Sequence, residues 1–256
     1  MAGNRSDNPL AFFIGGSMIE LKNVSFEIED EKNGSREIIK DLSLRVDNKQ
    51  FIAVTGPNGG GKSTLAKLIA GIYTPTSGEI YLNGIDITEM SISDRAKAGI
   101  AFAFQQPVRF KGLRVKDLLS IASGGEANLG QACEYLSAVG LCAKDYIDRD
   151  VDASLSGGEI KRIEIATLIA RKCQVAVLDE PEAGIDLWSF SNLIKIFEKM
   201  REERDRAIMV ISHQERILDI ADEIVVIKDG SIVAQGTRDT IMPELLKGTA
   251  GCKFYQ

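Results

Sequence analysis

The chain has 256 residues, and its 37 acidic and 31 basic side chains give a formal net charge of −6. This length is enough to bury a full core, either in two domains or in one large α/β domain with an insertion. A chain with this net negative charge lacks the clustered Lys and Arg side chains that bind nucleic-acid phosphates, so we expect no nucleic-acid partner.

The apolar and cysteine patterns restrict the class of protein further. The longest apolar stretches, such as 174–178 and 207–212, are far shorter than the roughly 20 residues of a membrane-spanning helix. The four cysteines form no C-x-x-C pair and match no zinc or disulfide spacing. We therefore expect reduced thiols in a cytoplasmic protein.

The first predicted elements start at Met18, after a segment 1–17 that we interpret as a leader or a remnant of cloning. Apolar residues alternate from Met18 to Val46 around a turn-forming Asn-Gly pair, which predicts antiparallel strands at a sheet edge. A buried strand at 51–55, a glycine-rich turn and a helix at 63–70 follow. Helical patterning with many charges at 113–150 predicts a helical insertion.

Beyond the insertion, helical and strand patterns alternate to the end of the predicted core: helix 157–170, strand 174–178, helix 189–201, strand 207–212, helix 214–220 and strand 223–227. Such alternation predicts an α/β fold with a mostly parallel sheet covered on both faces. We expect one domain over 18–240, with a helical subdomain at about 113–155, and a C-terminal tail at 241–256.

The strongest motif is a G-x-x-x-x-G-K-[ST] segment between the buried strand and the helix, formed by Gly56, Pro57, Asn58, Gly59, Gly60, Gly61, Lys62, Ser63 and Thr64. Its glycines let backbone N–H groups converge on phosphate oxygens, and the helix N-terminus adds positive charge. Lys62 is expected to neutralise the β- and γ-phosphates, and Ser63 to bind Mg²⁺. The motif predicts a site for a nucleoside triphosphate.

A second motif is an apolar run at 175–178 that ends in Asp179 and Glu180. The end of a central strand is where α/β sheets bind ligands, so these carboxylates should face the phosphate loop. Asp179 is expected to hold Mg²⁺, and Glu180 to orient and deprotonate the attacking water.

A third motif is Leu-Ser-Gly-Gly-Glu at 155–159, at the start of a helix. Ser156 offers a hydroxyl, and Gly157 and Gly158 offer unobstructed backbone amides, which suits a second anion site. A Ser followed three residues later by Glu is also an ordinary capping box, and the physics of the residues leaves both interpretations open.

The order of these motifs resembles that of the ATP-binding-cassette (ABC) ATPases over nearly all of 18–236, and implies their P-loop NTPase fold. By this resemblance Gln105 is the Q-loop glutamine, which contacts Mg²⁺ and the attacking water. His213, the only histidine, is the switch residue that senses the γ-phosphate, and 183–186 is the D-loop. The resemblance also implies a head-to-tail homodimer, in which Ser156, Gly157 and Gly158 of one subunit close over the ATP of the other.

Three segments, 94–107, 156–165 and 213–218, resemble the Suf-type ATPases of iron–sulfur cluster assembly. The resemblance implies soluble scaffold proteins as partners. The segment 73–79 is shorter than expected in that group, and Pro181 is similar to transporter ATPases. Their partner is a transmembrane permease subunit, and they lie peripheral to the membrane. Ile28 stands where many family members stack an aromatic side chain on adenine, which leaves the preference for ATP over GTP open.

Overall fold

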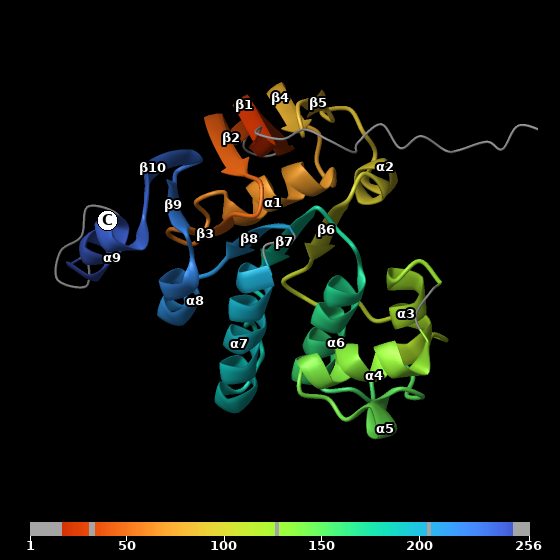
Figure 1. The fold of residues 1–256 in the computed structure, drawn as a ribbon. Coiled ribbons are helices and arrows are strands. Elements are labelled where there is room, and N and C mark those ends of the chain that lie inside the picture. Colours follow the sequence, from red (N-terminus) through yellow and green to blue (C-terminus); the bar gives the residue numbers. More distant parts are fainter. Residues whose placement is uncertain (1–16, 31–33, 126–127, 204–205, 248–256) are drawn as a thin grey trace, which may run out of the picture.

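The structure, a computed structural model, describes residues 17–30, 34–125, 128–203 and 206–247 (Figure 1). A four-stranded antiparallel sheet has the order β2-β1-β4-β5, from β1 (Ser17–Asp30), β2 (Gly34–Asp47), β4 (Ser77–Leu82) and β5 (Ile85–Asp86). β1 and β2 are the antiparallel pair that the sequence predicts. Alternate side chains of β2, including Leu42 and Leu44, are buried, so one face of this sheet packs on the core.

A second sheet has six strands in the order β10-β9-β3-β8-β7-β6. Its bounds are β3 (Phe51–Thr55), β6 (Ile100–Ala103), β7 (Val175–Asp179), β8 (Ala207–Ile211), β9 (Glu223–Lys228) and β10 (Ser231–Gly236). Only β10 runs antiparallel to its neighbour. Every residue of β3, β7 and β8 is buried, which is why these strands read as continuous apolar runs in the sequence.

Helices cover both faces of the six-stranded sheet. On one face α1 (Lys62–Ala70) lies between the two sheets (Figure 1), and its Leu65 and Ile69 belong to one apolar core with residues of both. The other face carries α6 (Gly157–Ala170), α7 (Leu187–Glu203) and α8 (Glu215–Ile220). The remaining helices are α2 (Ile92–Lys97), α3 (Val115–Ala122), α4 (Leu129–Ala138), α5 (Ala143–Tyr146) and α9 (Arg238–Lys247).

The predicted fold class is confirmed: an α/β chain with a mostly parallel sheet and antiparallel strands at its edge. Within the predicted insertion, α3 and α4 contact α6 beside the main sheet (Figure 1). α9 crosses residue 240, where the sequence places the start of the tail. None of the helices in the described ranges combines the length and the apolar character that a membrane-spanning helix needs.

Candidate functional site

Four neighbouring parallel strands end at the same edge of the six-stranded sheet, and each is followed by a sequence-predicted site residue. β3 leads into the glycine loop at 56–61, β6 into Gln105, β7 into Glu180 and β8 into His213. Because the strands are parallel and adjacent, segments that are far apart in the sequence meet at one carboxyl edge.

The glycine loop needs glycine for steric reasons, most clearly at Gly56 and Gly61. Gly56 has φ +132°, and a Cβ there would lie 2.0 Å from the carbonyl oxygen of Ile227. Gly61 has φ +104° as N-cap of α1, and a Cβ there would lie 2.8 Å from Cδ1 of Ile39. The loop is therefore packed tightly against the protein behind it, and α1 starts without a side-chain cap on its first N–H groups.

Lys62 and Ser63 open α1 directly after the loop. Lys62 is only 5% exposed, and its Nζ donates hydrogen bonds to the carbonyl oxygens of Gly56 (2.8 Å) and Pro57 (2.9 Å). Burial lowers the pKa of Lys62, against the opposing effect of the Glu180 and Asp179 carboxylates. The ammonium is thus held in the loop.

Asp179 and Glu180 end β7 opposite the start of α1. Asp179 is 2% exposed, and its Oδ1 accepts a hydrogen bond of 3.0 Å from the Ser63 hydroxyl. Burial raises the pKa of Asp179. Glu180 has φ +43°, a left-handed conformation that is uncommon outside glycine. Its Oε2 accepts a 2.6 Å hydrogen bond from Nε2 of Gln105.

His213 follows β8, next to these carboxylates. Its pKa is lowered first by partial burial and then by the positive charge of Lys62, while Glu180 acts in the opposite direction. The imidazole therefore lies within electrostatic reach of both side chains and favours its neutral form. Of the predicted residues, Gln105, Lys62, Ser63, Asp179, Glu180 and His213 are brought to one place.

A hollow of about 380 Å³ opens over this edge, lined by Arg36, Ile38, Asn58, Gly59, Gly61, Lys62, Ser63, Thr64 and Glu180. Amides at a helix N-terminus beside an ammonium group suit a polyphosphate. The Ser63 hydroxyl and the Asp179 carboxylate, 3.0 Å apart, supply the hard oxygen ligands that Mg²⁺ prefers. The residues present therefore fit a magnesium-bound nucleoside triphosphate.

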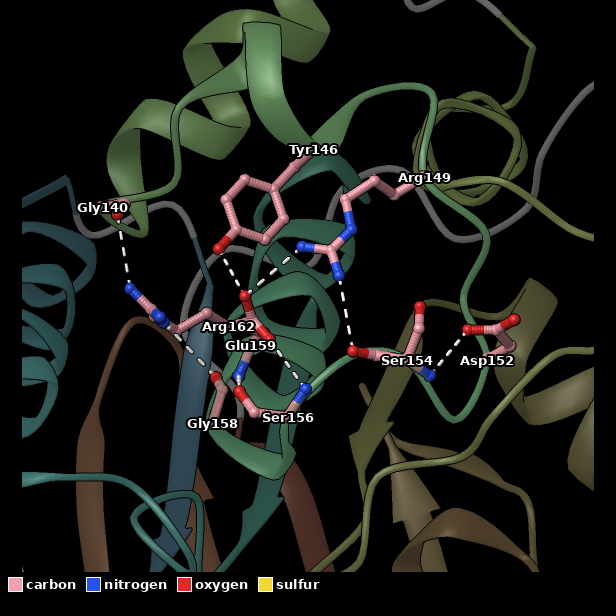
Figure 2. A network of polar contacts seen from close by, with 9 residues as sticks. All are labelled: Gly140, Tyr146, Arg149, Asp152, Ser154, Ser156, Gly158, Glu159 and Arg162. Atoms are coloured by element: carbon pink, nitrogen blue, oxygen red, sulfur yellow. Dashed lines mark hydrogen bonds and ion pairs between the residues drawn. The ribbon is translucent and has the colours of Figure 1, made fainter.

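Ser156, Gly157 and Gly158 do not line this hollow. They begin α6, where Ser156 and Glu159 form a capping box: the Ser156 N–H donates to Oε2 of Glu159 (2.7 Å), and the Glu159 N–H donates to the Ser156 hydroxyl (3.3 Å). Figure 2 shows further contacts from Tyr146 and Arg149 to the same Glu159 carboxylate. The capping box is confirmed, and an anion site in this segment stays a prediction.

Sequence reasoning missed a buried ion pair between Lys161 and Glu164. The Lys161 side chain is completely buried, and its Nζ lies 2.9 Å from Oε2 of Glu164. Lys161 also donates a hydrogen bond to the carbonyl oxygen of Phe104, whose N–H donates to Oε1 of Glu164 (3.0 Å). This pair, on α6, thereby binds both backbone groups of the residue before Gln105. A Lys followed by an Arg is typical of an exposed helix face, so the sequence does not indicate this buried ion pair.

An apolar groove of about 560 Å³ lies between β6 with its following loop, α3 and α6. Exposed apolar side chains line it, including Phe104, Val108, Phe110 and Ile121.

On the antiparallel sheet Ile28 is 43% exposed, while Phe26 stacks on Tyr73 with ring centroids 4.9 Å apart. One face of the Tyr73 ring is therefore covered by Phe26.

The loop, the helix start and the carboxylate pair at the sheet edge define a P-loop nucleotide-binding protein. A family model described as ABC transporter matches residues 39–183. The chain belongs to the ABC transporter family, and the prediction of an ABC-type ATPase is confirmed.

Relatives and solved structures agree with this assignment. An uncharacterised ABC transporter ATP-binding protein of Methanocaldococcus jannaschii is 39% identical over 79% of this chain and 84% of its own length. The energy-coupling factor transporter ATP-binding protein EcfA2 of Caldanaerobacter subterraneus is 30% identical over 88% and 81%. The fold matches a dimeric ATP-binding cassette in a post-hydrolysis state bound to ADP and Pi, with TM-score 0.78, 23% identity, and 86% and 99% coverage.

Proposed function

We propose that this chain is the ATP-binding subunit of a membrane transporter, which binds and hydrolyses MgATP in a head-to-tail homodimer on the cytoplasmic face of the membrane. The observation that carries the proposal is the convergence of Lys62, Ser63, Asp179, Glu180 and Gln105 at one sheet edge. The transporter role is supported by the relatives, which are named as ATP-binding proteins of transporters.

The residues at this sheet edge divide phosphate binding and metal binding between them in this proposal. The amides of Asn58, Gly59, Gly60 and Gly61 and the Lys62 ammonium bind the phosphates, and Thr64 lines the same hollow. Ser63 and Asp179, with Gln105, hold Mg²⁺, which supplies charge neutralisation on the β- and γ-phosphates when it is bound.

Hydrolysis needs a base and a residue that responds to the γ-phosphate. Glu180 accepts a proton from the attacking water, and the hydrogen bond from Gln105 to its Oε2 orients the carboxylate. The lowered pKa of His213 favours the neutral imidazole, whose N–H can donate a hydrogen bond to a γ-phosphate oxygen, while its other ring nitrogen can accept one from the attacking water.

The apolar groove is the surface through which nucleotide binding acts on a partner. It lies directly beside the segment 103–105. The Phe104 side chain lines the groove, and its backbone N–H and carbonyl oxygen are hydrogen-bonded to Glu164 and Lys161. We assign it to an amphipathic helix of the transmembrane subunit, because such a helix would cover Phe104, Val108, Phe110 and Ile121 with its apolar face.

Suf-type cluster assembly is the second candidate, supported by the resemblance of 94–107, 156–165 and 213–218 to that family. In that case the same groove would take a soluble scaffold protein. Among the described residues, Cys133, Cys142 and Cys173 form no disulfide.

A pull-down with the Glu180→Gln chain held in ATP separates the two candidates. Lys62→Ala is the matched control that should lose ATP binding, and Phe110→Asp is the control for the groove. A multi-span membrane protein that is captured by Glu180→Gln and lost in both controls would support the transporter subunit. Soluble partners that carry iron and labile sulfide would overturn it in favour of cluster assembly.

A further inference from the structure

The N-terminus of α6 carries a charge that conflicts with its proposed role. Glu159 is the third residue of the helix, and its carboxylate accepts the Ser156 N–H at 2.7 Å. In the proposed dimer the γ-phosphate of the partner subunit approaches Ser156, Gly157 and Gly158. A free carboxylate beside these groups would repel that phosphate, because like charges at short range destabilise one another.

Two side chains from the segment before α6 bind this carboxylate and offset part of its charge. The Tyr146 hydroxyl donates a hydrogen bond of 2.5 Å to Oε1 of Glu159, and NH1 of Arg149 lies 3.5 Å from the same oxygen (Figure 2). The Tyr146 hydrogen bond is the largest cause that lowers the pKa of Glu159 to about 2, so the carboxylate is ionised and needs these partners. The same contact raises the pKa of Tyr146, which stays a neutral donor.

Further hydrogen bonds fix the backbone on either side of Ser156. NH2 of Arg149 donates to the Ser154 carbonyl oxygen (3.4 Å). Nε of Arg162 donates to the Gly158 carbonyl oxygen (3.4 Å), and NH1 of Arg162 to that of Gly140 (3.3 Å). Figure 2 shows the two arginines holding the segment from opposite sides. The Glu159 carboxylate is thus engaged on both oxygens, and the amides of Gly157 and Gly158 are held in a fixed place.

We propose that Tyr146 and Arg149 are positioning residues for the partner subunit's ATP: by binding Oε1 of Glu159 they offset its charge and fix Ser156, Gly157 and Gly158 in the geometry that binds the γ-phosphate. This inference rests on the head-to-tail dimer of the proposed function. Neither residue lines the hollow over the P-loop of its own subunit.

Tyr146→Phe removes only the hydroxyl and tests the inference. Two quantities are measured: ATP binding by the monomer at high dilution, and ATP-driven dimerisation by sedimentation with Mg²⁺. Binding by the monomer is expected to stay unchanged, because the P-loop is untouched. Dimerisation is expected to weaken about tenfold, the usual effect of losing a hydrogen bond to a charged group. Arg149→Gln, an independent variant, should act in the same direction.

Tyr135→Phe is the matched control in the same helical region. Tyr135 is partly buried on α4, and among the described residues its hydroxyl makes no hydrogen bond. This variant should dimerise like the unmodified chain. A general loss of helix packing would affect both tyrosine variants and would also lower their thermal stability together.

A rescue experiment separates positioning from mere packing. Glu159→Gln keeps an acceptor for the Ser156 N–H but removes the charge, so Tyr146→Phe should change dimerisation less than about twofold in that background. An equal loss in both backgrounds, or no loss in Tyr146→Phe alone, would overturn the inference. If the unmodified chain does not dimerise with ATP, the proposed head-to-tail dimer fails first, and this inference fails with it.

Discussion

At the scale of single residues, the position of the Glu180 side chain depends on its backbone conformation as well as on the contacts of its carboxylate. Its left-handed φ of +43° places the side chain past the end of β7, while its N–H still donates to the Ile211 carbonyl oxygen of β8. Such a conformation is costly for a residue with a Cβ, and it persists where the surrounding structure fixes it. The hydrogen bond from Gln105 completes that fixation.

Glu180→Gln should retain ATP binding and lose about 10²- to 10⁴-fold of turnover, because the amide can accept the Gln105 hydrogen bond but cannot take a proton from water. Phosphate release and bound ATP are measured on the same preparation. Exposed Glu198→Gln on α7 serves as the control for a change of charge alone. Near-normal phosphate release by Glu180→Gln would remove Glu180 as the base.

The buried carboxyl group of Glu182 should make the stability of the fold depend on pH. Burial raises its pKa above the ordinary 4.5, its Oε1 accepts a 2.5 Å hydrogen bond from Ser212, and Oε2 has no hydrogen-bond partner among the described residues. The folded state therefore holds the proton more tightly than the unfolded state. The stability from this group is present below pH 4.5 and is lost as pH rises through the folded pKa.

Glu182→Gln imitates the protonated form at every pH. Its advantage in unfolding free energy over the unmodified chain should grow as pH rises from about 4 to about 7.5. Urea unfolding at both ends of this range measures the difference, and Glu198→Gln should show no such trend. A difference that is constant with pH would mean that Glu182 titrates as in the unfolded chain.

At the scale of secondary-structure elements, the Lys161–Glu164 pair ties α6 to the backbone before Gln105. Lys161→Met leaves the Glu164 carboxylate buried without its cation, so the free energy of unfolding should fall by about 3–5 kcal/mol. Lys199→Met, which breaks the exposed Lys199–Glu203 pair on α7, should cost about 0–1 kcal/mol. Chemical denaturation measures both variants.

The double variant Lys161→Met with Glu164→Gln separates a lost charge pair from lost packing. The Glu164→Gln change keeps a carbonyl acceptor for the Phe104 N–H without a buried charge, so much of the lost stability should return. A double variant as unstable as Lys161→Met alone would mean that packing of the lysine side chain, rather than the ion pair, stabilises α6.

The sequence predicts elements well where burial is uniform and poorly where it is not. The strand at 51–55 and the helix at 157–170 have the bounds that the sequence predicts, because fully buried strands and a strong N-cap leave clear patterns. The strand β6 is only four residues long, and α9 contains Pro243, so neither shows a clear periodicity. Both are missing from the prediction.

The contacts between secondary-structure elements at the site could not be predicted from the sequence. Gln105 and Glu180 are 75 residues apart, and only the order of the strands makes them neighbours. Resemblance to ABC ATPases indicated the residues but not this hydrogen bond. The same limit applies to Tyr146, whose contact with Glu159 depends on how the chain folds back before α6.

At the scale of the whole molecule, one subunit holds the P-loop hollow and the Ser156 segment at separate places, as a head-to-tail dimer requires. Mixed dimers with Lys62→Ala and Ser156→Arg test this arrangement. In a head-to-tail dimer, one change in each subunit damages the same site and leaves the other site intact. Both changes in one subunit damage both sites.

The two mixed dimers are compared in the Glu180→Gln background, purified through two different tags, by the amount of ATP that they retain. The dimer with one change in each subunit should retain about half of the ATP of the undamaged dimer, because one of its two sites is complete. The dimer with both changes in one subunit should retain almost none. If instead the second dimer retains ATP and the first does not, each site is built within a single subunit, and the nucleotide is not shared between subunits.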